Sequence, residues 1–180
     1  RTLCQRHLSI GADGFMVVKK PTDGGDYKML FFNSDGSMGE MCGNGARCIC
    51  RYGLENGLAG RVQRVETTAG LVTGWQVDRQ RYRVRLNDPC NIRLHDRMEA
   101  EGTIYDCAYL ELGDPGIPHA VVPIRGLRDY DTQTLRRLGR RLRYDPAFPK
   151  GANVNFYEII GKDHVYERTY ERGVEDFTYA

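Results

Sequence analysis

The chain has 180 residues, of which 41% are hydrophobic and 28% are charged, with a formal net charge of +2 at pH 7. This length holds one ordinary domain or two small ones, and the composition is that of a folded globular protein, which excludes disordered and collagen-like chains. Charged or strongly polar residues interrupt every apolar run before about 18 residues, so no membrane-spanning segment is expected. The charge is too evenly balanced to indicate nucleic acid or an anionic membrane as a partner.

Cysteine usage bears on the cellular compartment. The sequence contains six cysteines, namely Cys4, Cys42, Cys48, Cys50, Cys90 and Cys107. An even number allows disulfides, but a chain of this length can build its own core, and no signal-peptide pattern leads into the first cysteine. We therefore expect reduced thiols in a cytoplasmic protein. The chain opens at Arg1 without a methionine, inside a segment that resembles a helix, and it ends at Ala180 without a stop signal, so we interpret it as a fragment.

The first half of the chain predicts strands around one helix. Aromatic and apolar runs at 15–18 and 27–32 are separated by Pro, Gly and Asp residues, as in paired strands. Apolar residues recur at helical spacing within 44–56, and Asn56-Gly57 is typical of a helix end. Polar and apolar residues alternate strictly over 81–86, as in a half-exposed strand. We expect a helix at 44–56, strands at 15–18, 27–32, 62–68, 71–77 and 81–86, and a turn at Ala69-Gly70.

The segment at 86–91 is the best candidate for a domain boundary, because Asx residues and Pro89 interrupt both strands and helices. Beyond it we expect strands at 104–112, 119–124, 154–160 and 164–171, a loop at 113–118 and a helix at 132–143. The two halves therefore share one order of elements, without a direct sequence repeat. In the second helix the leucines fall on one face and the arginines on the other. We interpret the arginines as a solvated helix face rather than an anion-binding surface.

A glycine-rich segment at 32–48 leads from a predicted strand into the first helix and places Cys42 at the helix start. The first backbone N–H groups of a helix lack intrahelical partners, and this end of the helix dipole is positive. Both effects stabilise a thiolate and lower the pKa of a cysteine. Gly43 and Gly45 keep side-chain bulk away from the sulfur, so a ligand carboxylate or phosphate can approach the backbone donors.

The residues of this segment allow several interpretations. A phosphate loop is disfavoured because the G-x-x-x-x-G-K-[ST] pattern is missing, and because G-N-G-A-R lacks the third glycine of a dinucleotide fingerprint. A zinc site is disfavoured because C-x5-C-x-C is not a zinc spacing. Two interpretations remain open: a catalytic thiol beside a carboxylate-binding helix end, and a buried, inert cysteine.

The segment also resembles a known family. It contains Asn33-Ser34-Asp35-Gly36-Ser37 and then Glu40-Met41-Cys42-Gly43-Asn44-Gly45-Ala46-Arg47-Cys48, which together resemble the first cysteine motif of the diaminopimelate epimerase family. Three further segments match that family in the right order, at 6–14, 116–121 and 153–156 with 168–176. The resemblance therefore extends over nearly the whole chain.

The resemblance implies an α/β (α+β) fold of two pseudo-symmetric domains, each a sheet wrapped around a central helix, here at 1–89 and 90–180 with the second domain incomplete. It implies an isomerase that uses neither a cofactor nor a metal. One cysteine thiolate removes the α-proton of an amino acid, and a cysteine of the other domain delivers a proton to the opposite face. The family reaction interconverts LL- and meso-diaminopimelate on the route to lysine and peptidoglycan. The partners implied are a small-molecule amino acid and, by the habit of the family, a second copy in a homodimer.

Position by position, the resemblance assigns Cys42 as the first acid/base cysteine. Gly43 and Asn44 match the backbone donors around the substrate carboxylate. Asn33 and Asn153 match side chains that hold the substrate. Judged without the resemblance, Asn33 equally fits a turn former ahead of an Asp-Gly pair.

The resemblance assigns Glu171 and Arg172 to the distal end of the substrate, where an ammonium and a carboxylate are recognised, and an arginine fork suits a carboxylate. His119 and Glu171 match positions that tune the pKa values of the cysteines. The alternatives are a hydrogen-bonded core histidine at 119 and an ordinary strand-end ion pair at 171–172. Cys4, Cys90 and Cys107 match no motif, and we expect them to be packing residues. Cys48 and Cys50 lie on the helix that follows Cys42, and we expect them to be in the core.

Three departures from the family pattern keep rivals open. The chain stops at the residue before the expected second cysteine, so we expect this fragment alone to be inactive. Ile117 replaces an Asn that some members use, and Phe177 replaces a Glu that the family usually has near the second cysteine. One rival is a racemase of another amino acid on the same fold, of the histidine or proline type. A rival of another class is a non-catalytic module that binds a small molecule at the helix end.

Overall fold

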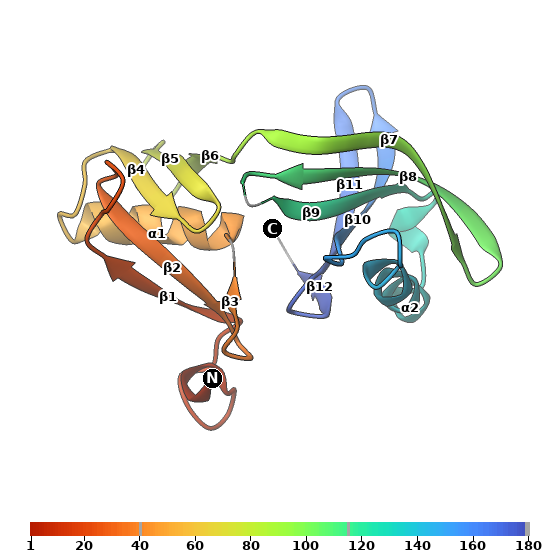
Figure 1. Ribbon diagram of the computed structural model, residues 1–180, viewed down its shortest axis with the longest axis horizontal. Helices are drawn as coiled ribbons and strands as arrows, with labels where there is room; N and C mark the ends of the chain where they lie inside the picture. The colour runs from red at the N-terminus through yellow and green to blue at the C-terminus, as the bar shows by residue number, and fades with distance from the viewer. Residues whose placement is uncertain (40, 115, 179–180) are drawn as a thin grey trace. The chain divides into compact units, whose positions relative to one another are not determined.

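The computed structural model describes residues 1–39, 41–114 and 116–178, and it divides into two compact units. The first unit is Arg1–Asp88 with Leu112–Ile117, and the second is Pro89–Glu111 with Pro118–Ala180. Each unit contains one sheet and one α-helix (Figure 1), so the predicted mixed α+β class is confirmed.

The elements of the first part are the 3-10 helix η1 (Thr2–Cys4), β1 (Gly14–Lys19), β2 (Tyr27–Asn33), β3 (Met38–Gly39), α1 (Gly43–Glu55), β4 (Val62–Thr67), β5 (Gly70–Gln76) and β6 (Tyr82–Arg85). Those that follow are β7 (Pro89–Ala100), β8 (Thr103–Leu112), β9 (Ile117–Pro123), the 3-10 helix η2 (Leu127–Asp129), α2 (Thr132–Arg143), β10 (Asn153–Gly161), β11 (His164–Glu171) and β12 (Asp176–Thr178). Both predicted helices start and end within one residue of their expected positions.

The two sheets repeat one connection. In the first sheet the order is β1-β2-β4-β5-β6, with β3 paired to β2, and the parallel neighbours β2 and β4 are joined through α1. In the second sheet the order is β12-β11-β10-β9-β8-β7, and the parallel neighbours β9 and β10 are joined through α2. Antiparallel hairpins then extend each sheet, as β4-β5-β6 and as β10-β11-β12. The shared order of elements expected from the sequence is therefore present.

Three local expectations are wrong. Pro89 opens the 12-residue strand β7 instead of interrupting regular structure, because the first residue of a strand can be a proline without losing a ladder hydrogen bond. The chain start contains only the short 3-10 helix η1 and no longer helix. The exposed Cys48 and Cys90 are not packing residues, whereas Cys4, Cys50 and Cys107 are buried. Cys48 lies two residues from Cys50, and at 100° per residue this turns its side chain to the other face of α1.

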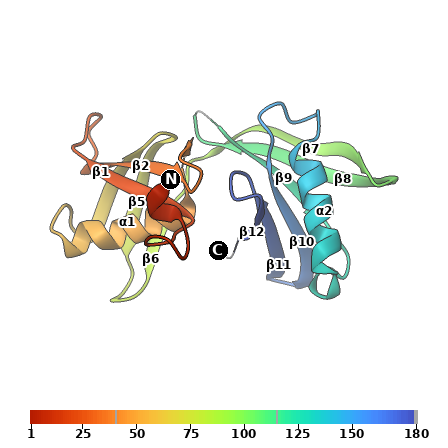
Figure 2. The same ribbon diagram turned by 90° about the horizontal axis from the view of Figure 1, so that it is seen from below.

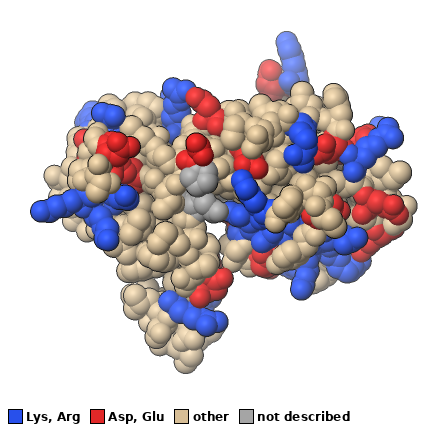
Figure 3. Space-filling model, viewed as in Figure 1, with Lys and Arg blue, Asp and Glu red and all other residues tan. Residues whose placement is uncertain are grey.

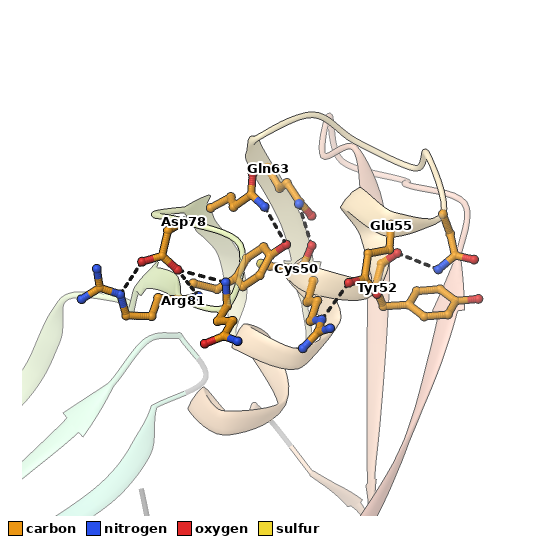
Figure 4. Close-up of polar contacts among 11 residues, drawn as sticks. Cys50, Tyr52, Glu55, Gln63, Asp78 and Arg81 are labelled. Carbon is orange, nitrogen blue, oxygen red and sulfur yellow. Dashed lines mark hydrogen bonds and ion pairs between the residues drawn. The ribbon is translucent and has the colours of Figure 1, made fainter.

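Helix α1 lies on the first sheet through a buried polar contact as well as through apolar packing. The hydroxyl of Tyr27 is 2.6 Å from Oε1 of Gln63 and 3.1 Å from the carbonyl oxygen of Ile49. Nε2 of Gln63 donates to the carbonyl of Cys50 at 2.7 Å (Figure 4). Burial raises the pKa of Tyr27, so the phenol is a neutral donor. A Cβ at Gly53 would lie 2.7 Å from both the Tyr27 hydroxyl and Gln63 Oε1, so only glycine allows this approach. The contact fixes where α1 lies on the sheet.

Helix α2 buries its leucine face on the second sheet (Figure 2). Leu135, Leu138 and Leu142 are at most 1% exposed and pack in one cluster with Phe156 and Tyr170. The predicted apolar face is therefore confirmed, and burying each leucine contributes roughly 1.5–3 kcal/mol to stability.

The arginine face of α2 is only partly solvated. Arg136 pairs with Asp176 at 2.8 Å, and Arg143 pairs with Glu175 at 3.2 Å. Figure 3 shows basic side chains, with acidic ones among them, around the position of α2. The helix thus holds Glu175 and Asp176, at the start of β12, through ion pairs with its arginines.

Among the described residues, no helix combines the length and apolar character that crossing a membrane requires.

The loop between β1 and β2 closes around one carboxylate, that of Glu66 on β4. Glu66 is 5% exposed and accepts hydrogen bonds from the backbone N–H groups of Thr22, Asp23 and Gly25, and from the Thr22 hydroxyl. Burial opposes ionisation, but the hydrogen bonds outweigh it and lower the pKa of Glu66 from 4.5 to about 2.

This carboxylate gives the stability a defined pH dependence. Because the folded-state pKa is the lower one, we expect the stabilisation by Glu66 to be complete above pH 4.5 and to be lost as the pH falls toward about 2. Denaturant unfolding of the wild type and of Glu66→Gln, compared from pH 7 to pH 2, should give a large stability difference at pH 7 that shrinks through this window. Glu55→Gln is the control, since Glu55 is exposed on α1. A pH-independent difference for Glu66→Gln would contradict this role.

Candidate active site

Cys42 is the N-cap of α1. Its Sγ accepts a hydrogen bond from the N–H of Gly45 at 3.3 Å, and its carbonyl accepts one from Ala46 at 2.8 Å. The thiol is half-buried rather than enclosed. The predicted position at the helix start is therefore confirmed, and the sulfur lies where first-turn N–H groups and the helix dipole favour a negative charge.

A small residue is needed next to this sulfur. A Cβ at Gly45 would lie 3.0 Å from the Met16 sulfur and 3.7 Å from Sγ of Cys42. The space beside Gly43 is more open, with Leu86 3.6 Å from an added Cβ. Gly45 therefore lets the helix start approach Met16 on β1, and both glycines leave the backbone donors uncovered by side chains of their own.

Asn33 ends β2 and begins the turn that leads toward the cysteine. Its backbone N–H and carbonyl bond to Ser37 and Gly36, which is the turn-forming role, and Gly36 has the positive φ of 91° that this turn requires. The side chain Nδ2 donates to the Ser37 hydroxyl at 3.0 Å, and Oδ1 lies 3.6 Å from the position of a Cβ at Gly39. Asn44, in the first turn of α1, accepts a hydrogen bond from Arg47 through Oδ1. The contacts that Asn33 and Asn44 are expected to make with a substrate remain predictions.

The predicted site residues of the second unit gather at one end of its sheet. His119 and Asn153 are register partners near the starts of the parallel strands β9 and β10. Because β11 is antiparallel to β10, its last residue, Glu171, and the following Arg172 reach the same end. The structure therefore brings these four residues together.

Hydrogen bonds connect this group to the chain around it. Asn153 is 6% exposed, and its Oδ1 accepts from the N–H of Arg172 at 2.8 Å. Glu171 accepts from the Thr178 hydroxyl at 2.9 Å, which ties β11 to β12. Arg172 extends toward the carbonyl of Lys150 at 3.4 Å. The carboxylate and the guanidinium are thus held on a fixed frame.

His119 has a partner that the sequence did not indicate. Its Nδ1 is 3.1 Å from Nδ2 of Asn155, and burial lowers the pKa of His119, so the imidazole is neutral at pH 7. Asn155 in turn contacts Thr169 across the strands at 3.0 Å. In the sequence, the signal that could have indicated this partner was strand periodicity, since positions 153 and 155 share one face of β10.

Four residues of the segments discussed above lie outside the described residues, namely Glu40, Pro115, Tyr179 and Ala180.

A groove of about 690 Å³ lies elsewhere in the first unit, along β1 and α1, and is lined by Gly14–Val18, Cys48, Ile49 and Tyr52. Its lining does not include the predicted site residues. Within 1–39, 41–114 and 116–178, no group of three or more His, Cys, Asp and Glu residues is placed to hold a metal ion.

Comparison with solved structures defines the class of fold. The chain superposes on a probable proline racemase from Agrobacterium radiobacter K84, crystallised with bound carbonate, with a TM-score of 0.65 over 88% of this chain and 54% of that one. The two sequences are 20% identical, so this likeness establishes the fold alone. The architecture is therefore that of the proline racemase and diaminopimelate epimerase class.

Sequence comparison identifies the family. The diaminopimelate epimerase family model matches residues 1–89. The diaminopimelate epimerase of Aquifex aeolicus is 38% identical over 183 residues, covering all of this chain and 63% of that protein, and that of Archaeoglobus fulgidus is 37% identical, covering all of this chain and 65% of that protein. The chain belongs to the diaminopimelate epimerase family, and it spans just under two thirds of the length of these relatives.

Proposed function

We propose that this protein is an epimerase that interconverts LL- and meso-diaminopimelate by transferring protons through thiols, without a cofactor. The observation that carries the proposal is the half-buried thiol of Cys42 at the N-cap of α1, inside the motif that matches the family. Two relatives named diaminopimelate epimerase, similar over the whole of this chain, support it.

The chemistry follows from the requirements of inversion. Inverting a stereocentre by proton transfer needs a base on one face of the carbon and an acid on the other. In our proposal Cys42 is one of the pair, and the resemblance places the other thiol directly after Ala180. Two thiols can exchange roles, so one site serves both directions. Backbone N–H groups at Gly43 and Asn44 stabilise the substrate carboxylate and the charge that develops on it.

The second unit supplies recognition in this proposal. Glu171 binds the distal ammonium of diaminopimelate, and Arg172 binds the distal carboxylate through its guanidinium fork. Asn33 and Asn153 hold the substrate near the reacting carbon. His119 and Glu171 tune the thiols. The support is that the four residues of the second unit share one end of its sheet.

The substrate itself is tested by measuring turnover on a panel of amino acids, with the protein extended beyond Ala180 to include the second thiol. We expect LL-diaminopimelate to be epimerised, and proline and histidine to be at least 100-fold poorer substrates, because neither offers both a distal ammonium and a distal carboxylate to Glu171 and Arg172. Racemisation of proline or histidine with inert LL-diaminopimelate would establish the rival racemase instead. Binding without any exchange of the α-hydrogen would establish the non-catalytic module.

We also propose a cytoplasmic location and a homodimer. Each unit has a hydrophobic core of its own, so the six cysteines need not be disulfides, which suits a reducing compartment. The dimer rests on the family resemblance, and sedimentation of the protein tests it.

A further inference from the structure

We propose that Asn155 is a positioning residue that holds His119 as the neutral tautomer with its proton on Nε2. The inference rests on the proposed function, because it gives His119 a defined role at the end of the second sheet. It is carried by a hydrogen-bonded row across three strands, from His119 on β9 through Asn155 on β10 to Thr169 on β11.

The row depends on which way the Asn155 amide faces. With Nδ2 toward His119, one N–H donates to the ring Nδ1 at 3.1 Å, and the amide nitrogen also lies 3.4 Å and 3.5 Å from the backbone carbonyl oxygens of Ala120 and Asn153. In the opposite orientation, Oδ1 would face these two carbonyl oxygens with no hydrogen between them, which is repulsive. The two carbonyls therefore fix Nδ2 on the side of His119.

The hydroxyl of Thr169 completes the assignment. It has one hydrogen and two acceptors in reach, Oδ1 of Asn155 at 3.0 Å and Oε1 of Glu167 at 2.9 Å. Glu167 is exposed, so water can satisfy its carboxylate, whereas the Asn155 oxygen is partly buried. With the amide oriented by the two carbonyls, the hydroxyl donates to Oδ1 of Asn155, and water satisfies the Glu167 carboxylate.

The consequence for the histidine is chemical. A ring nitrogen that accepts a hydrogen bond carries no proton, so in the neutral imidazole the proton is on Nε2. His119 then presents an N–H donor at Nε2, which stabilises an anion such as a thiolate or a substrate carboxylate and cannot remove a proton at that atom. The positive charge of Arg172 also disfavours the imidazolium form and so acts with burial to lower the pKa of His119.

Nitrogen-15 NMR of the histidine ring in the protein at pH 7.5 tests the assignment. We expect His119 to show an unprotonated Nδ1 and a protonated Nε2. In Asn155→Asp a carboxylate acceptor replaces the amide donor, so we expect the proton to appear on Nδ1. The exposed His164 is the internal reference, and its ring signals should not change. A protonated Nδ1 in the wild type, or no change in Asn155→Asp, would overturn the inference.

Activity then separates a positioning role from a structural one. We expect Asn155→Asp to lower kcat by about 10- to 100-fold, the usual cost of disturbing a partner that orients a functional histidine, with KM changed by less than about 3-fold. Thr169→Val should lower kcat, and Thr169→Ser should restore it, because only the serine keeps the hydroxyl donor. Equal kcat for wild type and Asn155→Asp, with the NMR change present, would overturn the positioning role. If the wild type shows the expected tautomer but epimerises no amino acid, the proposed function fails and the tautomer assignment stands.

Discussion

Replacing Cys42 by alanine, in the protein extended beyond Ala180 to include the second thiol, is expected to lower the kcat for epimerisation by at least about 10²- to 10⁴-fold, the usual contribution of a positioned acid or base. The substitution removes the only atom of that side chain that can carry a proton. It should leave the fold intact, because the sulfur caps α1 by accepting a hydrogen bond from the N–H of Gly45 at 3.3 Å, and a cap contributes typically about 1 kcal/mol. Circular dichroism and the thermal midpoint measure the fold, and steady-state kinetics measure the loss.

Cys48→Ala is the matched control for this variant. Cys48 lies on the same helix and is exposed, so the same chemical change there should leave kcat within about 2-fold of the wild type. Normal turnover by Cys42→Ala would refute the role of the sulfur. Equal losses in both variants would show that helix packing, rather than the thiol, had been measured.

Replacing Tyr27 by phenylalanine is expected to lower the free energy of unfolding by about 1–3 kcal/mol. The change removes one hydroxyl, and it leaves Oε1 of Gln63, a residue with 0% exposure, without the donor at 2.6 Å. A buried acceptor without a partner costs the full price of its desolvation, about 1–3 kcal/mol. Tyr52→Phe on the exposed face of α1 is the control and should change stability by less than about 0.5 kcal/mol.

A double variant distinguishes desolvation from lost packing. In Tyr27→Phe with Gln63→Leu, both polar side chains become apolar at similar volume, so neither leaves a buried side-chain atom unpaired. The carbonyls of Ile49 and Cys50 lose these donors, but they lie inside α1 and keep the N–H partners that a helix provides. We therefore expect the double variant to be at least as stable as Tyr27→Phe alone. Denaturant unfolding of the four proteins of this cycle measures the difference. Additive losses in the double variant would contradict the account of how α1 is held on its sheet.

Local patterns in the sequence predicted the elements that carry the site. The apolar spacing around Ile49 and Leu138 defined both helices, and the glycine-rich segment before Cys42 predicted its position at a helix start, because these signals lie within a few residues of one another. Strand β7 was missed because Asx residues and Pro89 are also typical of a loop between secondary-structure elements. The segment is a strand because it pairs with β8, and the residues of the segment alone do not reveal that pairing.

The sequence predicted those residues of the candidate site that lie in family motifs, but it did not predict the contacts between them. The motif positions gave Cys42 and Glu171, but the partner of His119 depends on the register between β9 and β10, which places Asn155 beside the ring. Cys48 and Cys50 are two residues apart on α1, so helix periodicity puts them on different faces, and only Cys50 is buried. Membership in the motif did not reveal this difference. Amide orientation and tautomer are set by atoms of three different strands and therefore require coordinates.

The central claim is that Cys42 transfers a proton on one face of the α-carbon while a different group acts on the other. Its most direct test is epimerisation of LL-diaminopimelate in D₂O by the protein that includes the second thiol, followed by mass and NMR analysis at low conversion. Thiols exchange with solvent, so the account expects nearly all product molecules to carry deuterium at the inverted carbon while the remaining substrate keeps its hydrogen. Product that retains the substrate's own hydrogen would show that one group acts on both faces, and it would contradict the account.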